Sequence, residues 1–180
     1  WALQYLSPRS LQQWDDWWDQ VPVADGRSGA DLYGDGLVEL ARRVADRPQV
    51  IGIDLMNEPF PGERFFDCVA GQCASRYAQV ATVLSAWTDR VRTAVPSMHV
   101  WWAGFNFGPP FQGTPAPGEG VGYTFHSYCL GTDGGEPTQP DAVSNSLCQG
   151  VFEGAVRDAR NIGGRWDSPI LLGEFGASAS

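Results

Sequence analysis

The architecture is indicated most strongly by Ile51-Gly-Ile-Asp-Leu-Met-Asn-Glu-Pro-Phe60, which extends an apolar run that begins at Val50. A short apolar run bounded by turn residues predicts a strand, here one of a parallel sheet with both faces buried. Pro59 ends the strand because proline has no backbone N–H to donate. In α/β proteins, polar side chains at the carboxyl ends of strands carry the chemistry. The stretch therefore predicts that Asn57 and Glu58 are presented at a functional site.

Two later apolar runs also end in polar residues. Val121-Gly-Tyr-Thr-Phe-His-Ser-Tyr128 ends in His126 and Tyr128, which alternate and so point to one side of an extended chain. Ile170-Leu-Leu-Gly-Glu-Phe-Gly-Ala177 contains a lone acid, Glu174. Each residue alone has a structural interpretation, such as a helix cap, a surface charge or a hydrogen-bonding histidine. Together with a second carboxylate they favour glycoside hydrolysis, in which one carboxyl group is the acid/base and the other the nucleophile or base.

The three strand ends resemble glycoside hydrolase family 5, a family of clan A retaining glycosidases with a (β/α)8 barrel. The motifs that carry the resemblance are Asn57-Glu58-Pro59, His126-x-Tyr128 and Glu174-Phe175-Gly176. The resemblance implies that Glu58 ends the fourth barrel strand as the acid/base and that Glu174 ends the seventh as the nucleophile.

The resemblance also implies roles for the neighbouring polar residues. Asn57 would hydrogen-bond the sugar 2-hydroxyl, Tyr128 would steer the nucleophilic carboxylate, and His126 would line the site near the acid/base. No metal and no cofactor are implied. The Arg and His that the family carries on earlier strands, and the Trp after its eighth strand, lie outside these 180 residues.

Longer stretches resemble one branch of the family, the endoglycoceramidases, which cleave between an oligosaccharide and ceramide. These stretches are 54–62, 105–108, 123–130 and 173–177. The implied substrate is a glycolipid, and the loops 59–74, 105–120 and 129–142 would supply apolar surface for ceramide. The alternatives are a cellulase-like endo-β-glucanase of the same family and, more remotely, a carbohydrate-binding protein without catalysis.

The chain of 180 residues is too short for eight β/α units, which need about 250 residues. We therefore expect residues 1–180 to form a single partial catalytic (β/α)8-barrel domain of the α/β class. They would be an internal segment that covers about strands 4 to 7 with their connections.

Composition excludes several classes of partner. The formal net charge of −9 argues against nucleic acid and against anionic membrane surfaces. No run approaches the ~20 apolar residues of a transmembrane segment. With two histidines and no Cys-x-x-Cys, a zinc site is poorly supported. We expect a monomer that acts on carbohydrate or glycolipid.

The four cysteines fall into two local pairs, Cys68 with Cys73 and Cys129 with Cys148. Two local disulfides would fit a secreted or extracellular protein, whereas four reduced, buried thiols would fit a cytosolic one. The resembled branch has extracellular members with cysteines in similar loops, which favours secretion.

Periodicity predicts strands and helices in alternation, with no helix between the strands near 100 and 123. The clearest helix carries apolar residues from Tyr77 to Val95 and is closed by Pro96. Other helices are expected after a cap at Ser10, over 37–47, and from Val143 to a stop near Gly163-Gly164, where glycine commonly ends a helix. A strand is expected at 98–103, with a structural His99 at its start. Trp17 and Trp18 are expected to pack in a loop or, alternatively, to form a sugar-stacking platform.

Overall fold

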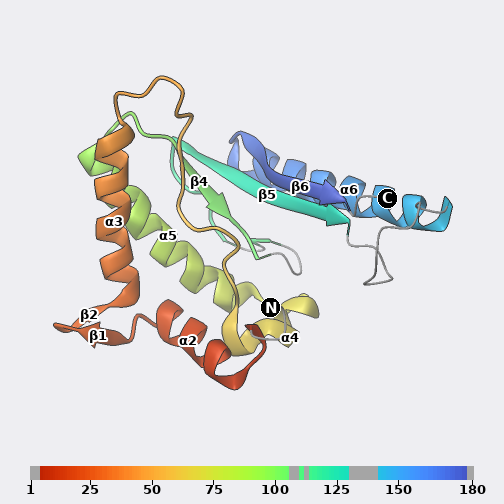
Figure 1. Ribbon diagram of the computed structural model, residues 1–180, viewed down its shortest axis with the longest axis horizontal. Coiled ribbons are helices and arrows are strands. Elements are labelled where there is room, and N and C mark those ends of the chain that lie inside the picture. Colours follow the sequence, from red (N-terminus) through yellow and green to blue (C-terminus); the bar gives the residue numbers. More distant parts are fainter. Residues whose placement is uncertain (1–4, 106–109, 112–113, 130–141, 178–180) are drawn as a thin grey trace.

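The computed structural model describes residues 5–105, 110–111, 114–129 and 142–177. Its centre is a parallel sheet of four strands, in the order β3-β4-β5-β6. Figure 1 labels β4, β5 and β6. The strands are β3 (Ile53–Asp54), β4 (Val100–Ala103), β5 (Val121–Cys129) and β6 (Ile170–Ala177). Because neighbours in the sheet follow one another along the chain and run parallel, their carboxyl ends meet at one edge. This is the arrangement of consecutive barrel strands.

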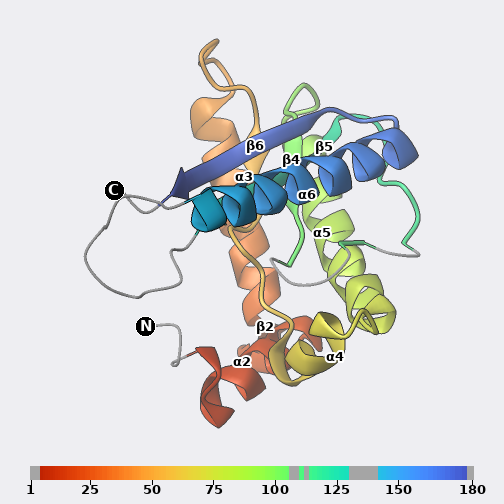
Figure 2. The ribbon, with the colours of Figure 1, turned by 90° about the vertical axis from the view of Figure 1, so that its right-hand side faces the viewer.

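Helices connect β3 to β4 and β5 to β6, and helices cover one side of the sheet. Figure 2 shows α6 lying along β6 and β5, with α3 and α5 further along the sheet. A small antiparallel pair, β1 (Pro22–Ala24) and β2 (Arg27–Ser28), precedes α3. The helical elements are α2 (Pro8–Trp18), α3 (Gly29–Val44), η1 (Gly62–Arg64), α4 (Phe65–Val69), α5 (Ala74–Ala94) and α6 (Ala142–Trp166).

The two faces of the sheet have different environments. Alternate residues such as Leu55, Trp102 and Tyr123 belong to the buried core that the helices cover. The residues at the intervening positions of the strands, including Asp54 and His126, lie on the opposite face of the sheet. The helix-covered face therefore holds the core, and the other face carries polar groups such as Asp54 and His126 together with Trp101.

The helix predicted from Tyr77 to Val95 is confirmed as α5. Its apolar residues, Tyr77, Val80, Leu84, Trp87, Val91 and Val95, are all buried. The chain leaves the helix just before Pro96, as expected, and His99 packs edge-on against Trp101 with ring centroids 4.6 Å apart.

Two predictions at the N-terminal helix are wrong. Ser7 caps α2, accepting from the N–H of Ser10 at 3.3 Å, because Pro8 needs no donor partner at the first helical position. Ser10 therefore lies inside the helix. The platform alternative for Trp17 and Trp18 is also wrong. Trp18 is buried and donates to the carbonyl of Phe60, and Trp17 packs edge-on against aromatic neighbours.

Two helix boundaries differ from prediction. The helix expected over 37–47 begins at Gly29, because Ser28 caps it by accepting from the N–H of Asp31 at 3.1 Å. The helix α6 continues through Gly163 to Trp166. A Cβ at Gly163 would lie 2.7 Å from Ile170, so this glycine serves close packing of α6 on β6 and does not end the helix.

The strand predicted at the start of the central stretch is shorter and less buried than expected. Regular pairing covers only Ile53 and Asp54, and Ile51 is 67% exposed. Because β3 is an edge strand within the described sheet, only β4 pairs with it. In the described part of the stretch between β4 and β5 there is no helix, as predicted.

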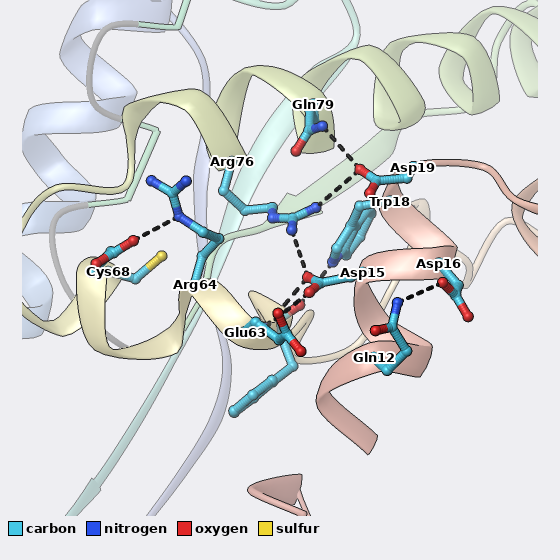
Figure 3. A network of polar contacts seen from close by, with 12 residues as sticks. Gln12, Asp15, Asp16, Trp18, Asp19, Glu63, Arg64, Cys68, Arg76 and Gln79 are labelled. Atoms are coloured by element: carbon cyan, nitrogen blue, oxygen red, sulfur yellow. Dashed lines mark hydrogen bonds and ion pairs between the residues drawn. The ribbon is translucent and has the colours of Figure 1, made fainter. Parts of the chain in front are cut away.

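A buried ion pair ties the N-terminal helix to α5. Figure 3 shows Arg76 directed at Asp15, with a nitrogen–oxygen distance of 2.5 Å and side chains only 7% and 13% exposed. Asp15 also accepts from the backbone N–H of Glu63, and Asp19 lies 3.5 Å from the guanidinium. The network therefore joins α2, α5 and the loop that follows Glu58.

We expect Asp15→Ala to lower the free energy of unfolding by about 3 kcal/mol or more, since it leaves a buried guanidinium without its close partner. The matched control is Glu39→Ala, which removes the exposed partner of Arg43 and should change stability by less than about 0.5 kcal/mol. Urea unfolding of the two variants measures the difference, and equal losses would contradict a structural role for the buried pair.

Candidate active site

The structure brings together four residues predicted from sequence. Glu58 follows β3, His126 and Tyr128 lie on β5, and Glu174 lies on β6. His126 Nδ1 is 2.8 Å from Glu58 Oε1 and 3.6 Å from Glu174 Oε2. Both carboxyl groups therefore approach the same imidazole nitrogen.

Glu58 adopts an unusual backbone conformation. Its φ is +43°, in the left-handed region that side chains with a Cβ disfavour, and it precedes Pro59, which restricts it further. Such strain costs on the order of 1–3 kcal/mol and persists only where the surroundings enforce it. Here the next residues are buried, and Trp18 Nε1 donates to the Phe60 carbonyl at 2.7 Å.

We expect Glu58→Gly to be more stable than Glu58→Ala by about 1 kcal/mol, because only glycine adopts a positive φ without steric cost. Both variants lack the carboxylate, so the comparison isolates the backbone. Thermal unfolding of the pair measures it. A less stable glycine variant would mean that the backbone at this position is unstrained.

Tyr128 holds the second carboxylate in place. Its hydroxyl donates to Glu174 Oε2 at 2.7 Å. This hydrogen bond raises the pKa of Tyr128, with smaller contributions from lost hydration and from the negative charges of Glu174 and Glu58. Tyr128 therefore stays protonated at neutral pH and can keep donating. Asn57, the remaining predicted residue, lies exposed beside Glu58.

Asp54 is a site residue that the sequence analysis missed, because it lies within the apolar run of the central stretch. Asp54 and Glu58 lie an even number of positions apart, so in an extended chain their side chains point to the same side, and this spacing could have identified Asp54. Lost hydration raises the pKa of Asp54 to about 6, the charge of Glu174 adds to the rise, and a hydrogen bond from Met56 N–H and the charge of His126 oppose it. By surface area, however, Asp54 is exposed, so water screens much of this effect.

We expect the difference in melting temperature between Asp54→Asn and the unsubstituted protein to grow as the pH rises. The folded state holds the Asp54 proton more tightly than the unfolded state, so the carboxyl group costs stability from about pH 4 up to about pH 6. Asparagine does not titrate, so Asp54→Asn does not lose this part of its stability as the pH rises. Melting curves across this range measure the difference, and a constant difference would show that the carboxyl group is ordinarily hydrated.

Glu58, His126 and Glu174 are also the one group among the described residues with ligand atoms close enough to share a metal ion, all within 4.8 Å of one another. Carboxylates and imidazole are ordinary metal ligands, but in this structure the same atoms are engaged in hydrogen bonds. The ring nitrogen is at hydrogen-bond distance from Glu58, and the Tyr128 hydroxyl occupies an oxygen of Glu174. The arrangement is suited to sharing and moving protons.

A parallel sheet with two carboxyl groups at its carboxyl edge is an arrangement that suits a glycoside hydrolase of the barrel type. The cellulase model, described as glycosyl hydrolase family 5, matches residues 11–180. The chain therefore belongs to glycoside hydrolase family 5.

Several of the similar proteins are endoglycoceramidases or a related ceramidase by name. Endoglycoceramidase I of Rhodococcus hoagii (strain 103S) is 34% identical over 139 residues, which are 71% of this chain and 27% of that protein. The lactosyl-enzyme intermediate of endo-glycoceramidase II from Rhodococcus sp. superposes with a TM-score of 0.69 at 22% identity, covering 98% of this chain and 38% of that one. An endogalactoceramidase gives a TM-score of 0.62 at 22% identity, with 95% and 34% covered. The chain thus spans about a quarter to two-fifths of these relatives, and its sheet corresponds to part of their fold.

Proposed function

We propose that the chain carries the catalytic pair of a retaining glycoside hydrolase, with Glu174 as nucleophile and Glu58 as acid/base. The observation that carries the proposal is that the carboxyl groups of Glu58 and Glu174 both lie close to His126, with oxygens within 4.8 Å of each other. Retaining enzymes need carboxyl groups about 5–5.5 Å apart, because the nucleophile must reach the anomeric carbon directly. An inverting enzyme needs a wider gap that admits water.

In the first step Glu174 attacks the anomeric carbon, and the bond to the leaving oxygen breaks. Glu58, protonated at this stage, gives its proton to that oxygen. The Nδ1–H tautomer of His126 can donate to Oε1 of Glu58 both while the other carboxyl oxygen carries the proton and after that proton has left. Tyr128 keeps one oxygen of Glu174 in place and leaves the other for attack.

In the second step Glu58 takes a proton from water, and the resulting nucleophile displaces Glu174 from the sugar. The anomeric configuration is thereby retained after two inversions. Asn57 is assigned to the sugar 2-hydroxyl, where a hydrogen bond strengthens as charge develops in the transition state.

The proposed substrate is a glycosphingolipid, cleaved between the oligosaccharide and ceramide. The names of the relatives support it, as does the solved complex of endo-glycoceramidase II with ganglioside GM3. Within the described part of the apolar loops, Phe60, Phe105 and Phe111 are buried core residues and are not free to bind lipid. Phe66, on the short helix α4 that follows Glu58 in the chain, is 73% exposed and is the aromatic candidate for contact with ceramide.

A polysaccharide is the second candidate substrate, because the matching family model is a cellulase. The tryptophans considered for stacking a glucan chain do not serve it, since Trp17 and Trp18 pack inside the protein. We therefore rank glycolipid first.

We further propose that residues 1–180 form part of one catalytic barrel domain, and that the protein is extracellular. Cys68 and Cys73 form a disulfide, as predicted, and Cys148 is also disulfide-bonded. The side chain of Cys129 lies outside the described part of the chain, so its pairing with Cys148 stays a prediction. Every described helix is too short or too polar to cross a membrane.

The test is hydrolysis of ganglioside, glucosylceramide and soluble cellulose by the intact protein and by Glu58→Ala, Glu174→Ala and the surface control Glu39→Ala. We expect free oligosaccharide and ceramide, with a loss of at least about 100-fold in Glu58→Ala and no measurable turnover in Glu174→Ala. On an aryl glycoside whose leaving group needs no proton, Glu58→Ala should recover much of the first step, and Glu174→Ala should not.

Each alternative result has a distinct meaning. Turnover of cellulose alone would keep the mechanism and replace the substrate. Activity that survives Glu174→Ala would overturn the site, and sugar binding without turnover in the unsubstituted protein would point to a binding protein.

A further inference from the structure

The pairing of β5 with β6 contains one irregularity, and it lies at the site. Tyr123, Thr124 and Phe125 pair in order with Ile170, Leu171 and Leu172. The next residue of β5, His126, pairs with Glu174. Gly173 is thus an extra residue on β6 with no partner opposite it, which is a β-bulge.

The bulge decides which face of the sheet Glu174 occupies. Side chains alternate between faces, so a shift of one residue moves every later side chain to the other face. With regular pairing, Gly173 would face His126, and Glu174 would face Ser127 on the helix-covered side. With the bulge, Glu174 lies beside His126 and within 2.7 Å of the Tyr128 hydroxyl.

A side chain at position 173 would be incompatible with this arrangement. A Cβ there would lie 2.7 Å from Thr124 Oγ1, and 3.3 and 3.4 Å from Nε2 and Cδ2 of His126. Thr124 is 1% exposed and β-branched, so it has little freedom to turn away. The imidazole is also held by Glu58 through Nδ1. Added atoms would therefore push either His126 or the strand that carries Glu174.

We propose that Gly173 is a positioning residue for the nucleophile. Its missing side chain lets β6 bulge against Thr124 and His126, and the bulge delivers Glu174 to the face that holds Glu58. The inference rests on the proposed function, because it assumes that Glu174 attacks the sugar.

The test follows formation of the glycosyl-enzyme directly. A dinitrophenyl 2-deoxy-2-fluoro-β-lactoside reacts when the Glu174 carboxylate bonds to the anomeric carbon and dinitrophenolate leaves with the bonding electrons, and no proton is needed. Mass spectrometry of the intact protein and its peptides gives the rate and the labelled residue. We expect Gly173→Ala to label Glu174 at least about 100-fold more slowly than the unsubstituted protein, since a misplacement of about 1 Å costs that much.

Rescue separates positioning from a general loss of structure. The double variant Gly173→Ala with Thr124→Ala removes the atom nearest to the new methyl group and should recover labelling, measured against Thr124→Ala alone. The double variant Gly173→Ala with Thr124→Val keeps a side chain of about the size of threonine at position 124, so its labelling should stay slow. The matched control is Gly164→Ala on α6, where a Cβ meets nothing within 4 Å, and its labelling should equal that of the unsubstituted protein.

The outcomes are distinguishable. If the unsubstituted protein labels at a residue other than Glu174, the proposed function fails, and the inference fails with it. If Glu174 is labelled equally fast in Gly173→Ala, the proposed function stands and the inference is overturned. If Gly173→Ala does not fold, the double variant Gly173→Ala with Thr124→Ala is the test. If this double variant also fails to fold and to label Glu174, the contact with Thr124 is not what requires glycine at position 173.

Discussion

Parallel pairing of four successive strands is the constraint on which the rest of the structure depends. It collects the carboxyl ends of β3, β4, β5 and β6 at one edge, so residues 116 positions apart, Glu58 and Glu174, meet at one imidazole. Glu58 follows β3 and His126 lies on β5, and although β4 separates these two strands in the sheet, the two side chains are 2.8 Å apart. The same pairing separates the sheet into a face covered by helices and a face available for chemistry.

The position of Glu58 is maintained against a local preference. Its left-handed backbone is unfavourable, and the contacts that hold the following loop come from distant parts of the chain. Trp18 bonds to the carbonyl of Phe60, and Asp15 bonds to the N–H of Glu63 while it neutralises Arg76. The N-terminal helix thus supports a catalytic candidate that it does not itself contain.

The site places two carboxyl groups, Glu58 and Glu174, at one histidine, with Asp54 on the same face of the sheet. Lost hydration and the nearby charge of Glu174 favour the protonated form of Asp54, and the tyrosine that contacts Glu174 is kept neutral by that contact. Lost hydration is thus the largest cause at Asp54, and the hydrogen bond to Glu174 is the largest cause at Tyr128.

The amino-acid sequence by itself determined the features that depend on near neighbours. A polar residue that ends an apolar run is visible locally, so Asn57, Glu58, His126, Tyr128 and Glu174 could be selected, and the buried row of α5 followed from its period. Tertiary structure alone decided the features that depend on distant partners. It decided that Trp18 is buried and bonded to Phe60, that α6 continues through Gly163 because β6 packs there, and that Asp54 belongs to the site. It also decided the face that Glu174 occupies, because a bulge is a property of two paired strands and the alternation within one strand does not reveal it.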